Sequence, residues 1–228
     1  MDDRKQIFFV EGADDRGVVK ALLRASGKND QWFERACRIA GGNGNFSEML
    51  EGLALSLKNT KAYDVIAIIS DADEDAQSTW SNILKTFRNA LGPTAQSYDF
   101  PETLPRDGFL ANPKRDGLPT LGAWIMPNNR SGRMLEDFFL RLISENDLLL
   151  QEAERVLLDL ESKGLKRYKK IHRSKAKVHT WLAWQDPPGK PMGLGMDIFK
   201  DRMVLKAPEA VEFLEWIETL LPEIARSS

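Results

Sequence analysis

A short apolar segment that ends in a cluster of acidic residues constrains this chain more than any other feature. Residues 65–70 are mostly apolar and β-branched, which is typical of a strand buried in a parallel sheet. Four carboxylates follow within five positions, and like charges at this spacing repel one another. Mg²⁺ and Mn²⁺ prefer oxygen ligands, so Asp71 and Asp73 are candidate metal ligands. The alternative is a solvated acidic loop that caps the next helix.

A second apolar strand also ends in acidic residues. Residues 6–10 are followed by Glu11 and Gly12, and then by Asp14 and Asp15 at the start of an amphipathic helix. Ligands of open α/β sheets bind at the carboxyl ends of the strands, so we expect the two acidic clusters to share one edge of the sheet. Asp14 and Asp15 also suit a helix N-cap, and this competing interpretation is the stronger one for Asp14.

The order of the predicted elements gives the fold class. A βαβαβα pattern runs over residues 6–91 and implies a parallel sheet with right-handed crossovers. Residues 92–120 are rich in Pro and Gly and are expected to form a long loop, with a candidate edge strand at 95–99. We therefore predict an α/β domain over 1–145, with a mostly parallel four-stranded sheet flanked by helices, and a helical C-terminal extension over 146–228 packed on it. The strands are expected at 6–10, 36–40, 64–70 and 121–126, and the helices at 14–25, 46–58, 76–91, 133–144, 146–163, 173–184 and 208–225.

Composition narrows the class of protein. The chain has a net charge of −2 and is 42% hydrophobic, which is enough for a sizeable core. No apolar run approaches the roughly 18 residues of a membrane span, and no segment resembles a signal peptide, so no membrane partner is expected. The single cysteine, Cys37, excludes an intrachain disulfide and a zinc–thiolate cluster, and a cytoplasmic location is expected. The glycine-rich residues 41–45 suggest a tight turn rather than a phosphate-binding loop.

Positive charge is concentrated in residues 163–177. Eight Lys and Arg residues lie in these fifteen positions, and no acid occurs from residue 162 to residue 185. Such a segment can contact the phosphates of a nucleic acid. The alternatives are a solvated helix face or a contact with an acidic protein. The candidate nucleic-acid-binding residues are Lys166, Arg167, Lys169, Lys170 and Arg173.

Taken together, the two acidic motifs resemble those of the Toprim domain. Glu11-Gly12-x-x-Asp15 follows one predicted strand, and Asp71-x-Asp73 follows another about 60 residues later. The chain is most similar to the OLD-family branch, in particular to stand-alone Toprim proteins encoded beside an ATPase gene. The resemblance covers nearly the whole chain, and the similarity to this branch lies in residues 122–129, 132–137 and 175–184.

The resemblance implies a metal-dependent nuclease. Glu11, Asp71 and Asp73 would hold one or two Mg²⁺ or Mn²⁺ ions, or Glu11 would instead act as a general base on the attacking water. Asp15 and Glu136 would complete the ligands of the second ion, with Glu136 preferred to Asp137 because of the apolar residues around it.

A lysine late in the domain is also implied by the resemblance. Lys175 or Lys177 would offset the charge that develops on the phosphate in the transition state, and the sequence does not distinguish them.

The expected activity is cleavage of phosphodiester bonds, with DNA favoured over RNA. The resemblance also implies an ATPase partner in trans and a role in phage defence, and it leaves the oligomeric state open. The competing hypothesis is a non-catalytic or effector subunit of an ATPase complex that binds nucleic acid or a protein. A phosphatase with an aspartate nucleophile also carries Asp-x-Asp after a strand, but prefers it on the first strand, whereas here the motif follows the third.

Overall fold

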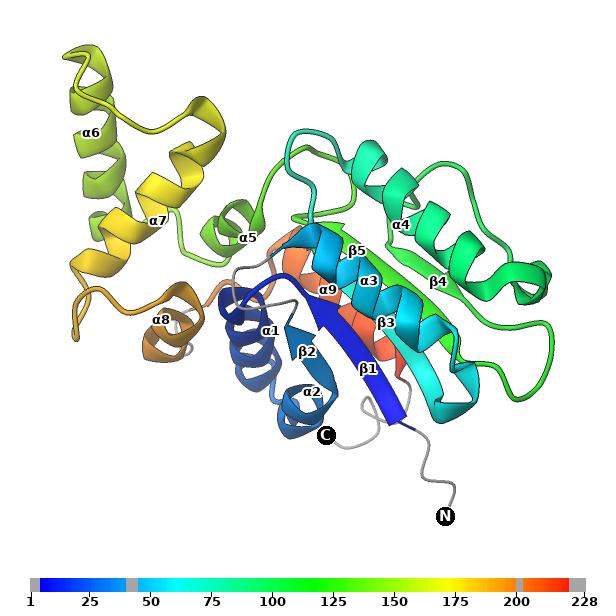
Figure 1. The fold of residues 1–228 in the computed structure, drawn as a ribbon. Helices are drawn as coiled ribbons and strands as arrows, with labels where there is room; N and C mark the ends of the chain where they lie inside the picture. The colour runs from blue at the N-terminus through cyan, green and yellow to red at the C-terminus, as the bar shows by residue number, and fades with distance from the viewer. Residues whose placement is uncertain (1–4, 40–44, 200–202, 222–228) are drawn as a thin grey trace.

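The computed structural model describes residues 5–39, 45–199 and 203–221, with the backbone alone for residues 197–199. At its centre lies a five-stranded sheet in the order β2-β1-β3-β5-β4 (Figure 1). The edge strand β4 is antiparallel to β5, and the other neighbouring pairs are parallel. The chain is therefore a mixed α/β protein with a mostly parallel sheet. The strands are β1 (Lys5–Val10), β2 (Cys37–Ile39), β3 (Tyr63–Asp71), β4 (Phe109–Ala111) and β5 (Thr120–Met126).

Alternating side chains of β1, β3 and β5 point into two separate cores, as the period of two in a β-strand requires. Phe8 and Val10 of β1 pack into one core, and Ile7 and Phe9 pack into the other. Both faces of the sheet are thus covered by helices, which explains why the strands read as continuous apolar runs. The first face carries α1 (Ala13–Ala25), α2 (Gln31–Ala36) and α9 (Pro208–Leu220), and the second carries α3 (Phe46–Leu57) and α4 (Ala76–Leu91).

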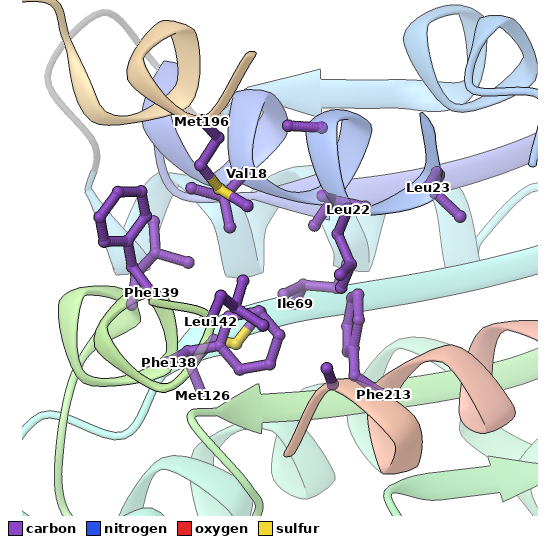
Figure 2. Close-up of a cluster of buried hydrophobic side chains, with 14 of the residues drawn as sticks. Val18, Leu22, Leu23, Ile69, Met126, Phe138, Phe139, Leu142, Met196 and Phe213 are labelled. Carbon is purple, nitrogen blue, oxygen red and sulfur yellow. The ribbon is translucent and has the colours of Figure 1, made fainter. Parts of the chain in front are cut away.

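Four further helices lie beyond the carboxyl ends of the strands, with α6 and α7 furthest from the sheet (Figure 1). Figure 2 shows Phe138 of α5, Met196 of α8 and Phe213 of α9 in one apolar cluster with Val18 of α1. Residues 208–220, which the sequence assigns to the C-terminal extension, therefore contribute to the main core. These four helices are α5 (Leu135–Arg141), α6 (Leu148–Ser162), α7 (Arg173–Ala183) and α8 (Met192–Phe199).

Helix α8 approaches α1 so closely that both helices need glycine at the crossing. A Cβ atom on Gly17 would lie 2.5 Å from the Cα atom of Gly193, well inside van der Waals contact. At the same place, the backbone N–H of Gly193 donates to Oδ1 of Asp14 at 3.0 Å. Asp14 thus has a structural role, and it fastens α8 to the helix that also carries Asp15.

The sheet differs from the prediction in the segment 92–120. We expected four strands, but β4 adds a fifth, and the candidate strand at 95–99 lies largely in a 3₁₀ helix (Gly92–Ser97). The strand β4 has only three residues, and its place is set by tertiary packing, since Phe109 is buried against the ring of Trp80 at 4.9 Å. A strand this short has too little alternation to be recognised among prolines and glycines.

Two short helices were also absent from the prediction. Helix α2 has six residues, and α8 contains Gly193 and Gly195, which lower helix propensity. In the predicted turn at 41–45, residues 41–44 lie outside the described residues, and Asn45 accepts a hydrogen bond from Ser47 N at 3.0 Å as the cap of α3. The end of the predicted helix 208–225 also lies outside them. None of the helices in the described ranges is long and apolar enough to cross a membrane.

Candidate metal centre

The parallel register brings the ends of β1 and β3 to the same edge of the sheet. Val10 pairs with Ile69, so Glu11 lies beside the end of β3. Ser70 Oγ donates to Glu11 Oε1 at 2.7 Å, and the backbone N–H of Asp71 donates to the same oxygen at 2.9 Å. These two bonds join residues about 60 positions apart and fix the Glu11 carboxyl group at the carboxyl edge.

Asp15 lies deeper, in the first turn of α1, and is 7% exposed. Its Oδ2 accepts a hydrogen bond from Gly12 N at 2.9 Å, whereas its Oδ1 is buried and has no hydrogen-bond partner. Burial first, and then the negative charge of Glu11, raise the pKa of Asp15 to about 7. An unpaired buried carboxylate oxygen is costly, so this atom is suited to receive a cation.

Asp71 is held by the helix that follows β5. Its Oδ1 accepts a hydrogen bond from the backbone N–H of Leu135, at the start of α5, at 2.7 Å. Burial raises the pKa of Asp71 well above its usual range, and the charges of Asp15, Glu11 and Glu136 raise it further. Burial is also the main cause of the raised pKa of Glu11. Four acids from three parts of the chain therefore act on one another electrostatically.

Glu136 is 4% exposed and forms an ion pair with a lysine of α7. Lys175 Nζ lies 3.3 Å from Glu136 Oε1, whereas Lys177 Nζ lies 3.0 Å from Glu154 Oε2 on α6. The neighbouring Asp137 accepts hydrogen bonds from Met134 N and from a serine hydroxyl of α7, and so stabilises the start of α5. The structure therefore brings Glu136 and Lys175 to the acidic group, and it leaves Lys177 outside.

Asp73 is more exposed than the other predicted ligands. Its side chain is exposed and its φ is 50°, in the left-handed region that places the chain in a tight turn after β3. Its charge still contributes to the raised pKa of Glu11. It is thus close enough to act on the acidic group electrostatically, although it is less buried than Asp15 and Asp71.

We define the acidic cluster as Glu11, Asp15, Asp71 and Glu136. In the described ranges, no group of three or more His, Cys, Asp or Glu side chains is arranged so that it could hold a metal ion. The donor types nevertheless fit a hard divalent ion, because all are carboxylate oxygens and one of them, Oδ1 of Asp15, is buried without a partner. A cation would also favour the ionised forms of carboxyl groups whose pKa values are raised by burial and by one another.

The predicted nucleic-acid-binding residues divide into two groups. Arg173 donates to Glu154 at 2.6 Å and to Glu161 at 2.9 Å, so its guanidinium group joins α6 to α7. This pairing lowers the pKa of Glu154 to about 2. Lys166, Arg167, Lys169 and Lys170 are exposed, and the ammonium group of Lys166 lies 6.0 Å from the ring of Tyr168.

Sequence reasoning missed two residues of the site. Ser70 is fully buried and positions Glu11, and a small polar residue at the end of an apolar run was the available signal. Arg133 lies in the loop before α5, the helix that carries Glu136, and was not singled out, because an isolated arginine in a loop carries no pattern. Its backbone oxygen accepts a hydrogen bond from Ala72 N at 3.1 Å, which ties the loop before α5 to the loop after β3.

The fold and the site define an α/β protein with a carboxylate cluster at the carboxyl edge of its sheet. Over residues 5–222 the chain matches DUF3226, a family described as protein of unknown function, and it belongs to that family. No curated protein matches the chain. No solved structure matches it either.

Proposed function

We propose that this protein is a Toprim-type nuclease that uses Mg²⁺ or Mn²⁺ to cleave phosphodiester bonds in nucleic acid, with DNA favoured over RNA. The observation that carries the proposal is the acidic cluster, in which burial and neighbouring carboxylates raise the pKa values of Asp15 and Asp71, and Glu136 is paired with a lysine. Buried acids in a structural role normally have cationic or hydrogen-bonding partners, and an oxygen of Asp15 has none.

The fold supports the same proposal. Both acidic motifs follow parallel strands, β1 and β3, which are neighbours in the centre of the sheet. This is the edge at which open α/β sheets bind ligands. The mostly parallel sheet and the placement of Glu11 and Asp71 agree with the resemblance to the Toprim domain.

Each residue would have a distinct role. Glu11, Asp15 and Asp71 would hold the ion or ions, with Asp73 and Glu136 as further ligands. A bound divalent ion polarises a phosphoryl oxygen and lowers the pKa of a water molecule. Glu11 is also placed to accept a proton from water, because its raised pKa makes it a stronger base than an exposed glutamate.

Lys175 would neutralise negative charge on the phosphate as the bond breaks. Its side chain is 52% exposed and the side chain of its partner Glu136 is 6% exposed, so the ammonium group lies between the acidic cluster and solvent. Of the two candidate lysines we therefore assign this role to Lys175. Lys177 is paired with Glu154 and would contribute to the packing of α6 against α7.

The resemblance further suggests an ATPase partner, a cytoplasmic setting and a part in phage defence, which we include in the proposal. The alternative is a binding subunit that has the same fold but no activity of its own. These two functions differ in whether the isolated chain cleaves nucleic acid.

The test is cleavage of supercoiled plasmid by the purified chain with Mg²⁺ or Mn²⁺, compared with the same reaction in EDTA. We expect nicking or linearisation that requires the metal and falls on the order of 10²-fold or more in Asp71→Asn, because loss of a ligand removes several kcal/mol of charge stabilisation. Asp116→Asn is the matched control, since Asp116 is an exposed acid in the loop before β5. Cleavage by Asp71→Asn at the rate of the control would refute the proposed function.

A further inference from the structure

A groove of about 690 Å³ is lined by segments that adjoin the acidic cluster in the chain, although none of the four carboxylates of the cluster lines it. Several of its lining residues lie within three positions in the chain of a residue assigned to the site. Glu74 follows Asp73, Arg133 precedes Glu136 by three positions, and Ser174 precedes Lys175. A ligand that fills this groove would therefore contact the segments that carry Asp73, Glu136 and Lys175.

The floor of the groove is fixed by the close crossing of two loops. A Cβ atom on Gly132 would lie 1.9 Å from the carbonyl oxygen of Glu74, so no other residue fits there without moving the backbone. The hydrogen bond from Ala72 N to Arg133 O holds the same two loops together. The backbone of the two loops therefore fixes this part of the groove.

The Lys and Arg side chains that line the groove differ in whether a neighbouring acid neutralises their charge. Lys169 and Lys170 are exposed, and neither takes part in any ion pair of the described residues. Arg133 is 57% exposed and lies 3.4 Å from Asp137, which already accepts a hydrogen bond from Ser174 Oγ at 2.6 Å. These three side chains therefore retain most of their charge for a ligand.

Arg173 also lines the groove, but its charge is committed elsewhere. It is held by Glu154 and Glu161, and this pairing raises its pKa above the usual range. A guanidinium group with two carboxylate partners adds little net charge to the groove. The basic segment thus contains residues with different functions, although they look alike in the sequence.

We propose that this groove seats one phosphodiester backbone beside the acidic cluster, with Arg133, Lys169 and Lys170 binding the phosphates next to the one that is cleaved. This inference rests on the proposed function, because only a nuclease would cleave the phosphate that lies at the acidic cluster. A chain of phosphates fits the arrangement, because one phosphate can lie at the cluster while its neighbours lie against the cations. Arg binds phosphate in a forked geometry and Lys binds it as a point charge, so both are suited to the role.

The test measures binding without cleavage. A labelled oligonucleotide, as a single strand and as a duplex, is titrated with the intact chain in EDTA at several salt concentrations, and binding is read by fluorescence anisotropy. The variant is Arg133→Gln/Lys169→Gln/Lys170→Gln. The matched control is Lys58→Gln/Lys61→Gln/Lys85→Gln, which removes the same charge from exposed positions on α4 and before β3.

We expect the slope of log K against log salt to fall by about 0.9 per lost contact on the duplex and about 0.7 on the single strand. If a phosphate contact contributes nothing to the affinity at 1 M salt, the loss of three contacts weakens duplex binding by about 500-fold at 0.1 M salt. The two probes show whether the phosphodiester backbone comes from single-stranded or duplex nucleic acid, because the preferred form binds more tightly. The control triple variant should keep the slope of the unmodified chain.

A slope in the groove variant equal to that of the control, or no binding by the unmodified chain at low salt, would overturn the inference. Arg173→Gln should leave the slope unchanged and lower the melting temperature, since it leaves Glu154 and Glu161 without their partner. The binding test and the cleavage test can fail independently of each other. Binding that depends on the groove without any cleavage would refute the nuclease and keep the groove, and cleavage with groove-independent binding would do the reverse.

Discussion

Replacement of Asp15 by Asn should stabilise the metal-free protein at neutral and alkaline pH. The pKa of Asp15 rises from 3.8 to about 7 on folding, mainly because the carboxyl group is buried. An acid with a raised native pKa binds more protons in the native state than in the unfolded state between these two values, so stability falls as the pH rises through this range. Three pKa units correspond to about 4 kcal/mol, and this is the largest gain expected from Asn.

The assay is urea denaturation in EDTA at pH 5 and pH 8. The unmodified chain should lose stability between the two pH values, and Asp15→Asn should lose less, with the difference concentrated at pH 8. Asn keeps the oxygen that accepts the hydrogen bond from Gly12 N, so the local turn should persist. Asp116→Asn, the exposed control, should follow the unmodified chain. Equal stability of Asp15→Asn and the unmodified chain at pH 8 would refute the reasoning, because it would show that the buried charge costs nothing.

The remaining predictions concern the residues around Asp15. Ser70→Ala removes the hydroxyl that donates to Glu11, so the metal affinity should fall about 10- to 100-fold. Calorimetric titration measures this affinity, and an unchanged value would count against a positioning role for Ser70. Gly132→Ala should lower the free energy of unfolding in urea by about 1–3 kcal/mol, because the added methyl group meets the carbonyl oxygen of Glu74. An unchanged free energy of unfolding would show that the loops do not cross this tightly. Lys175→Ala should reduce kcat of plasmid cleavage with little change in KM, whereas Lys177→Ala should mainly lower the melting temperature. The reverse pattern would exchange the roles of the two lysines.

Much of the central sheet could be predicted from the sequence. The strands at 6–10, 64–70 and 121–126 are confirmed because each is an apolar run long enough to stand out between helices. The strand β4 could not be predicted in the same way. It exists because Phe109 fills a space beside Trp80 and Phe87, which is a tertiary contact rather than a local pattern.

The site was predictable in outline but not in detail. Acids at the ends of two parallel strands must lie at one edge, so the proximity of Glu11 and Asp71 follows from the order of the elements. The distinction between Lys175 and Lys177 does not follow, because residues two apart on a helix point in nearly opposite directions and the rotation of the helix decides which one faces the acids. The partners of Arg173 likewise depend on how α6 packs against α7, since they lie 12 and 19 positions away.

The central claim is that the carboxylates at this edge hold a divalent metal ion. Its most direct test is anomalous scattering from crystals of the protein grown or soaked with Mn²⁺. We predict a peak between the carboxyl groups of Glu11, Asp15 and Asp71 that disappears in Asp71→Asn. The absence of a peak there at saturating Mn²⁺, or a peak only at another place on the protein, would contradict the account.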